Sequence, residues 1–101
     1  MAHLVVLFWR DIPAQVIVRR GRTAAKRPLS ERFVQAIDRA AMRSGAQETD
    51  AYLAEWRKSA PESCGDDLEA EADRAAAHFE KMYDNGRLAQ LAANGGREEK
   101  Q

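Results

Sequence analysis

The chain has 101 residues, of which 45% are hydrophobic and 32% charged, a mixture typical of one globular domain rather than of a disordered chain. Its 16 Lys and Arg balance its 16 Asp and Glu, and this argues against a dedicated nucleic-acid binder. No apolar run is long enough to span a membrane, and the apolar residues 4–9 are too few for a signal peptide, so we expect a cytoplasmic protein.

Two strands are expected first. Residues 4–10 are rich in Leu, Val, Phe and Trp, which is typical of a strand. Pro13 fixes φ and lacks an N–H, so the strand should break there. Residues 15–19 form the second strand, and the short spacer predicts an antiparallel hairpin. A basic loop around Gly21 follows.

The next segment predicts a helix from an N-cap at Ser30 to a stop at Gly45. Leu29 and Val34 have the spacing of a hydrophobic staple. The apolar stripe expected to face the core consists of Phe33, Val34, Ile37, Ala40 and Ala41.

Residues 52–56 alternate between apolar and polar, which favours a third strand; one or two helical turns from a Thr49 cap are the alternative. A loop spans residues 59–65. A second helix begins at Asp66, which forms a capping box with Glu69. Its stripe is Leu68, Ala72, Ala75, Phe79 and Met82. Residues 87–93 predict a short third helix.

The expected architecture is therefore an α+β domain over residues 1–93, in the order β-β-α-β-α, with a three-stranded sheet backed by two helices. Residues 94–101 are expected to form a flexible tail. The first strand is apolar on both faces, whereas a half-exposed antiparallel strand should alternate with polar residues. The uncovered face thus predicts a further layer: the C-terminal helix, a second copy or a foreign partner.

No catalytic constellation, metal site or cofactor site is predicted. Cys64 is the only thiol, and neighbouring acidic residues raise rather than lower a thiol pKa. His3 and His78 lack further ligands for a metal. The carboxylates of residues 66–73 are explained by capping and solvation of a first helical turn.

The most suggestive polar feature is the basic run at residues 19–27. Its candidate anion-binding or partner-binding residues are Arg19, Arg20, Arg22, Lys26 and Arg27. Clustered cations can bind phosphates, but no nucleotide-binding motif accompanies them. A solvated loop and an acidic protein partner are the other interpretations.

Trp9 and Trp56 both lie in apolar patterns typical of a core or its edge. At an exposed rim, a tryptophan is a preferred interface anchor. Each is followed by an arginine, as fits a boundary position. Trp9, Arg10 and Trp56 are therefore candidate interface residues.

The run Leu-Val-Val-Leu-Phe-Trp-Arg-Asp-Ile-Pro-Ala-Gln-Val from Leu4, the basic segment after it and Tyr-Leu-Ala-Glu-Trp-Arg from Tyr52 resemble the virulence factor domain family of small bacterial proteins. A related domain occurs in the conserved virulence factor C of staphylococci. The resemblance covers about residues 3–90. It implies no catalytic residues, and it implies an association with one-carbon metabolism.

Three functions follow as expectations. The preferred one is a non-enzymatic accessory module that binds a protein partner, or a second copy, through its sheet. The alternative is a binder of nucleic acid or an anionic ligand through the basic residues 19–27. The third is a small enzyme or enzyme subunit that uses Cys64, His78 or the acidic residues in a shared site.

Overall fold

The computed structural model describes residues 1–46 and 48–98 of the chain, which form an antiparallel sheet and four helices. This confirms the α+β class, but the sheet has five strands rather than three. The strands are β1 (Ala2–Trp9), β2 (Ile12–Arg20), β3 (Thr23–Pro28), β4 (Trp56–Lys58) and β5 (Glu62–Cys64). The helices are α1 (Glu31–Ser44), α2 (Thr49–Ala54), α3 (Leu68–Met82) and α4 (Asn85–Ala93).

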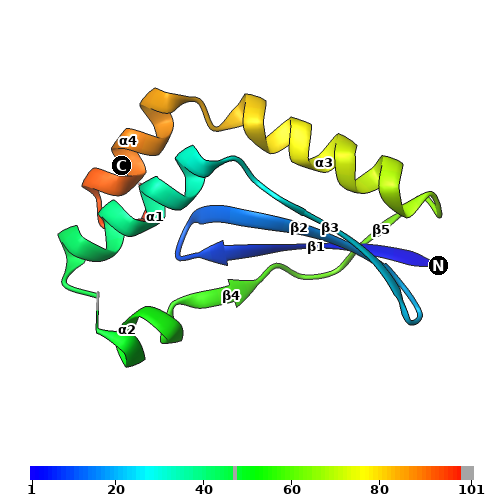
Figure 1. The fold of residues 1–101 in the computed structure, drawn as a ribbon, viewed down its shortest axis with the longest axis horizontal. Helices are drawn as coiled ribbons and strands as arrows, with labels where there is room; N and C mark the ends of the chain where they lie inside the picture. Colours follow the sequence, from blue (N-terminus) through cyan, green and yellow to red (C-terminus); the bar gives the residue numbers. More distant parts are fainter. Residues whose placement is uncertain (47, 99–101) are drawn as a thin grey trace.

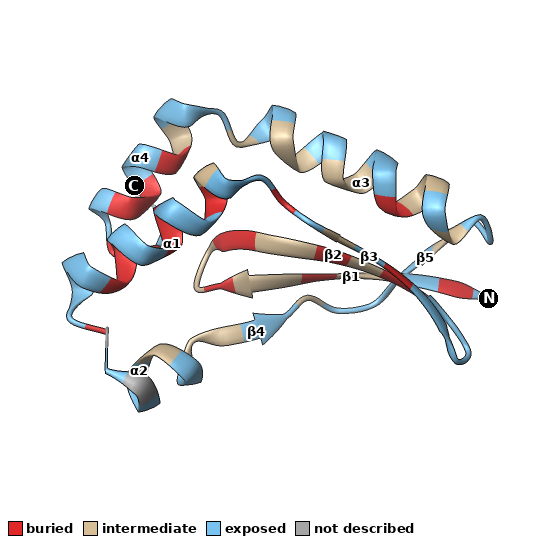
Figure 2. Cartoon of the chain, viewed as in Figure 1, coloured by how far each residue is buried: buried red, intermediate tan, exposed pale blue. Residues whose placement is uncertain are grey.

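The central strand of the sheet is β1. The strand order is β3-β2-β1-β4, and β5 pairs with β1 further along the same side as β4. Helix α3 runs along the sheet, while α1 and α4 pack on each other near one end of it (Figure 1). Buried residues lie where these helices face the sheet and one another (Figure 2). No helix in the described residues is long and apolar enough to cross a bilayer.

The hairpin of β1 and β2 corrects the role predicted for Pro13. The strands turn at Arg10 and Asp11, and Pro13 lies within β2, opposite Phe8. The register shifts between Leu7 and Phe8. A bulge is one of the few places where a strand accepts a residue without an N–H. Pro13 therefore lies next to this irregularity within β2 and does not end the strand.

The predicted basic loop is also a hairpin. Strand β3 pairs with β2 from Arg20↔Thr23 to Gln15↔Pro28, around a turn in which Gly21 has φ +60°. Charged residues are depleted in strands, so sequence pattern did not indicate one here. An edge strand tolerates charges because its side chains can reach water, and lysine at an edge also discourages pairing with another chain.

Residues 52–54 belong to α2, and a strand begins only at Trp56. The strand predicted for residues 52–56 is therefore wrong over most of its length. The helical alternative is right in type, although the N-cap of α2 is Glu48 and Thr49 is its first residue. The physical reason is aromatic packing: the Tyr52 ring stacks on Trp9 with centroids 5.7 Å apart and meets Trp56 edge-on at 5.9 Å. From its place in α2, Tyr52 contacts both the Trp9 ring of β1 and the Trp56 ring of β4.

The ends of α1 agree with prediction: Ser30 is its N-cap and Gly45 ends it with φ 77°. The cap works differently, however, because Ser30 makes no side-chain bond to its own helix. Instead its backbone N and its Oγ donate to the Glu80 carboxylate, at 2.7 and 2.8 Å. Val34 is 49% exposed, so the predicted staple with Leu29 does not form.

The later helices differ from prediction by one or two residues. The N-cap of α3 is Asp67 rather than Asp66, and its side chain accepts from Ala70 N. Met82 was predicted to belong to the apolar stripe of this helix, but it is half-exposed. Helix α4 begins at Asn85, capped by Asp84.

The Glu80 carboxylate joins α3 to the start of α1, and its contacts make the stability of the fold depend on pH. Burial alone would raise its pKa, but hydrogen bonds from Ser30 and Arg32 outweigh this and lower the pKa below the ordinary 4.5. A carboxylate whose pKa is lower in the folded state than in the unfolded state stabilises the fold at pH values above its unfolded-state pKa. This stabilisation is lost as the pH falls through the folded-state pKa. We expect Glu80→Gln to lower the free energy of unfolding by about 1 kcal/mol at pH 7, since the carboxylate is partly solvated.

This difference between Glu80→Gln and the native chain should shrink as the pH is lowered from 5 toward 3, as measured by urea unfolding at each pH. Asp38→Asn is a suitable control, because this exposed carboxylate on α1 has no ion pair within the described part of the chain. A Glu80→Gln effect that is constant from pH 7 to pH 3 would contradict the assignment.

The segment after α4 packs on the hairpin turn of β1 and β2. Asp11 N donates to Gly96 O at 2.8 Å, and Arg10 Nη1 donates to Gly95 O at 2.8 Å. Glu98 N donates to Asp11 Oδ2 at 2.7 Å. Gly95 and Gly96 are buried. The tail expected over residues 94–101 is thus packed against the sheet as far as Glu98, and residues 99–101 lie outside the described part.

Candidate functional site: the open face of the sheet

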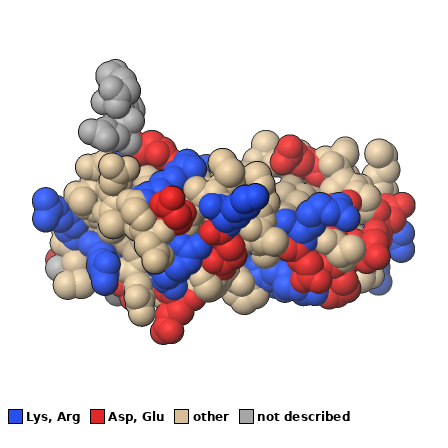
Figure 3. Space-filling model, turned by 90° about the horizontal axis from the view of Figure 1, so that it is seen from above, with Lys and Arg blue, Asp and Glu red and all other residues tan. Residues whose placement is uncertain are grey.

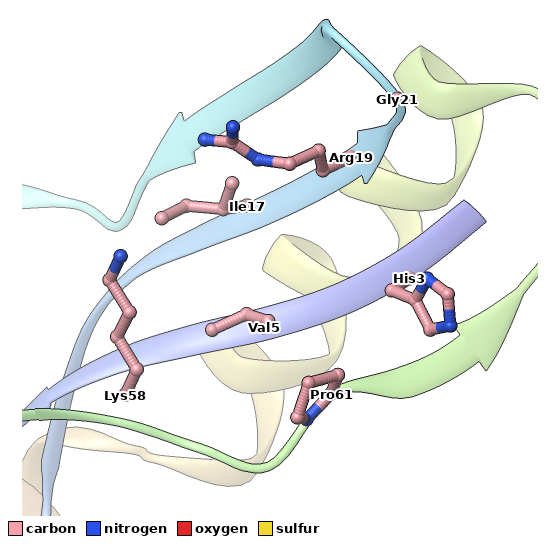
Figure 4. A pocket seen from close by; sticks show the side chains of 7 residues that line it. All are labelled: His3, Val5, Ile17, Arg19, Gly21, Lys58 and Pro61. Carbon is pink, nitrogen blue, oxygen red and sulfur yellow. The ribbon is translucent and has the colours of Figure 1, made fainter.

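The two faces of the sheet have different environments. Val16, Val18 and Ala25 are buried beneath Ala72 and its neighbours on α3. Alternate residues point the other way, and there Val5, Leu7 and Ile17 are only half-buried. In Figure 4 the side chains of Val5 and Ile17 project from the side of the sheet opposite to α3. This is the second apolar face that the sequence of β1 predicted.

A shallow hollow of about 450 Å³ lies on this face. It is lined by His3, Val5, Ile17, Arg19, Gly21, Lys58 and Pro61, which come from β1, β2, the turn after β2, β4 and the segment before β5 (Figure 4). The floor is aliphatic, and the polar groups stand at its margin. Such a surface suits a ligand with an apolar centre.

The charges around the hollow all have one sign. Lys26 pairs with Ile17 and therefore shares its face, while Lys58 pairs with Leu7 on the other side. Glu62 pairs with Leu4, and its side chain therefore lies on the face of the sheet that α3 covers. We define the open face as His3, Val5, Leu7, Ile17, Arg19, Lys26 and Lys58.

The helical side of the molecule contrasts with the open face. Figure 3 shows Lys and Arg side by side with Asp and Glu over the helices. Several of these are paired: Arg32 contacts Glu80 at 3.0 Å and Arg74 contacts Glu71 at 2.7 Å. On the open face, Arg19, Lys26 and Lys58 form no ion pair with any side chain in residues 1–46 and 48–98.

The hairpin divides the predicted basic run between different surroundings. Arg19 and Lys26 lie on the open face. Arg27 points to the other face, where its guanidinium binds Glu69 and Asp73 of α3, and these bonds raise its pKa. Arg20 and Arg22 are exposed at the tip of the hairpin. The structure therefore brings together only some of the basic residues 19–27, which were predicted from the sequence to form one anion-binding or partner-binding site.

The predicted interface residues have structural contacts. Trp9 is 0% exposed, and its Nε1 donates to Tyr52 O at 2.9 Å. The side chain of Arg10 is 16% exposed and lies 3.3 Å from Glu55. Trp56 is half-buried beside Tyr52. Trp9 thus fills the core, as its apolar pattern allowed, and Arg10 connects the turn to Glu55 and Gly95.

The candidate catalytic groups are dispersed. Cys64 lies in β5 opposite Ala2, and its thiol pKa is raised by burial, Glu71 and Asp66. A raised pKa leaves less of the nucleophilic thiolate. His78 packs edge-on against Phe79 at 5.7 Å. The described residues contain no group of three or more His, Cys, Asp and Glu placed to hold a metal ion.

The open face was found only in part from the sequence. Val5 and Leu7 belong to the second apolar face predicted for the first strand, but Ile17 and Lys58 were not among the candidates. Arg19 and Lys26 were chosen only as part of a charge run. The signal that could have found them is the pairing register. Once β2 and β3 are recognised as a hairpin, alternation alone places Arg19, Ile17 and Lys26 on one face.

The fold and this face define a small α+β module whose sheet is covered by a helix on one side and is open, apolar and cationic on the other. The family model for "Virulence factor" matches residues 7–92. The chain therefore belongs to the virulence factor family. Neither the curated proteins nor the solved structures gave a match to the chain.

Proposed function

We propose that this chain is an interaction module that binds a protein partner through the open face of its sheet. The observation that supports this most directly is the aliphatic surface of the open face, where Val5 and Ile17 line the hollow and Leu7 is half-buried. Apolar patches of this kind mark binding surfaces in monomeric proteins. The module would act as an accessory subunit, and the link to one-carbon metabolism implied by the resemblance stays a prediction.

The proposal is tested by affinity capture of the tagged chain from its native lysate in low and high salt, with Ile17→Asp as the disruptive variant. We expect at least one stoichiometric protein partner to be retained by the native chain and lost by Ile17→Asp, because a carboxylate in the apolar floor would be desolvated on binding. Val34→Asp is the matched control, since Val34 is a 49% exposed aliphatic residue on α1.

Thermal unfolding of each variant by circular dichroism ensures that loss of the partner is not loss of the fold, and Ile17→Ala provides a milder second variant. A captured set that is identical for the native chain, Ile17→Asp and Val34→Asp would refute the open face as the binding surface.

A second candidate function is binding of nucleic acid or another polyanion by the tip of the β2–β3 hairpin. It is favoured by Arg20 and Arg22, which are exposed there, and by Arg19 nearby. Such binding would fall steeply with salt and would be removed by replacing Arg20 and Arg22 with Ala. Binding to the open face should survive that double replacement, which separates the two candidates.

A further inference from the structure

If the open face binds a protein, as in the proposed function, its residues also indicate the chemistry of the partner. We propose that the open face receives an amphipathic helix of another protein, which lays its apolar stripe on Val5, Leu7 and Ile17 and directs carboxylates toward Lys26, Arg19 and Lys58.

The pairing register supports this arrangement. Val5 lies opposite Ile17, and Ile17 lies opposite Lys26, so an apolar strip along β1 and β2 has a lysine on its β3 side. Leu7 lies opposite Lys58 of β4, which places a second lysine on the other side of the strip. Arg19 stands beyond Ile17, toward the hairpin tip. The apolar strip is thus bordered by cations on three sides.

The covered face of the same sheet provides a template. There α3 presents Ala72 and Phe79 to the sheet, while its Glu69 and Asp73 bind Arg27 of β3. Lys26 is the neighbour of Arg27 and points to the opposite face because side chains alternate along a strand. A helix on the open face could therefore place carboxylates against Lys26 as α3 places them against Arg27.

Two other occupants fit the open face less well. In a symmetric pair of copies joined through this face, the same patch meets itself, so Arg19, Lys26 and Lys58 would face cations instead of carboxylates. Single-stranded nucleic acid usually stacks its bases on aromatic rings of a sheet. The strip between the cations is aliphatic. The neighbouring ring of Trp9 is buried, and the half-buried ring of Trp56 packs edge-on against Tyr52.

The experiment is a titration of the ¹⁵N-labelled chain with a synthetic amphipathic helical peptide that carries a leucine stripe and glutamates on its remaining positions. We expect saturable shifts centred on the amides of Val5, Ile17 and Lys58. In the charge-reversed chain, Arg19→Glu, Lys26→Glu and Lys58→Glu together, affinity for this peptide should fall by about tenfold or more, since three favourable pairs become repulsive.

A version of the peptide with lysine in place of glutamate should show the opposite preference and bind the charge-reversed chain better than the native one. The control chain carries Arg39→Glu, Arg43→Glu and Lys81→Glu, which replace three exposed cations elsewhere, and it should bind the glutamate peptide within about twofold of the native chain.

Three results would overturn the inference: equal affinity of the native and charge-reversed chains for the glutamate peptide, stronger shifts of the same amides by an oligothymidine, or self-association of the native chain that Ile17→Asp abolishes. The capture experiment separates this failure from that of the proposed function. A partner that is lost with Ile17→Asp but retained by the charge-reversed chain would keep the interaction module and remove only the acidic helix.

Discussion

Replacing Trp9 with Ala is expected to lower the free energy of unfolding by about 3–5 kcal/mol, the largest effect of any substitution considered for this chain. The ring is 0% exposed, stacks on Tyr52 at 5.7 Å and belongs to the core cluster that includes Ile12 and Phe33. Its removal leaves a cavity and also takes away the donor to Tyr52 O. Since small domains are stable by only about 5–15 kcal/mol, much of the variant should be unfolded at moderate temperature.

The matched comparison is Trp56→Ala. Trp56 is half-buried and contacts the edge of Tyr52, so its loss should cost clearly less, about 1–2 kcal/mol, because surrounding water can fill the space. Urea unfolding followed by circular dichroism measures both. Equal losses for the two variants would show that Trp9 is not the central core residue that its burial indicates.

Replacing Gly96 with Ala is expected to lower the free energy of unfolding by about 2–4 kcal/mol, the second largest effect. A Cβ on Gly96 would lie 3.0 Å from Cζ3 of Trp9 and 3.4 Å from Cβ of Ala40. The residue also has φ +89°, which side chains other than glycine adopt only at a cost of about 1 kcal/mol or more. Tyr52 stacks on the same ring with centroids 5.7 Å apart, which limits how far the Trp9 ring can move.

Gly21→Ala separates the two causes. Gly21 has a similar positive φ of +60°, but no atom lies within 4 Å of a Cβ built there. It therefore bears the backbone cost without the clash, and we expect a loss of about 1 kcal/mol. If Gly96→Ala were no more destabilising than Gly21→Ala in the same unfolding assay, the close contact with Trp9 would not constrain the fold.

The sequence predicted well those elements whose own residues determine them. The apolar stripe containing Phe33 and Ile37, with Ser30 and Gly45 at its ends, was sufficient to locate α1. The stripe of α3 was likewise clear, although its cap lay one residue further on. These are local signals, because a helix satisfies its hydrogen bonds within its own segment.

The elements that were missed depend on distant partners. Strand β3 consists mostly of exposed residues, includes the charged Lys26 and Arg27, and exists because β2 offers a free edge. Strand β5 has three residues, and its pairing with β1 joins residues about sixty positions apart in the chain. No periodicity can develop over three residues, so its hydrogen bonds become predictable only when the position of β1 is known.

The same dependence limited the prediction of the site. The run Trp-Arg-Asp-Ile-Pro looks like a recognition motif, but its residues hold the fold together. Trp9 and Ile12 enter the core, and Asp11 binds Arg57 at 3.3 Å and the backbone of Glu98. Conversely, Val5 and Ile17 look like ordinary strand residues, and only the position of α3 on the opposite face leaves them at the surface.

The contacts between the β1–β2 turn and residues 95–98 also have a consequence for folding during synthesis. The bonds from Arg10 to Gly95 and from Glu98 to Asp11 join residues 85 and 87 positions apart. The ribosome releases the first strand long before it has made the residues that close over Trp9. Closing such long loops is slow compared with forming local contacts, so the nascent chain must keep an unfinished core until residues 95–98 emerge.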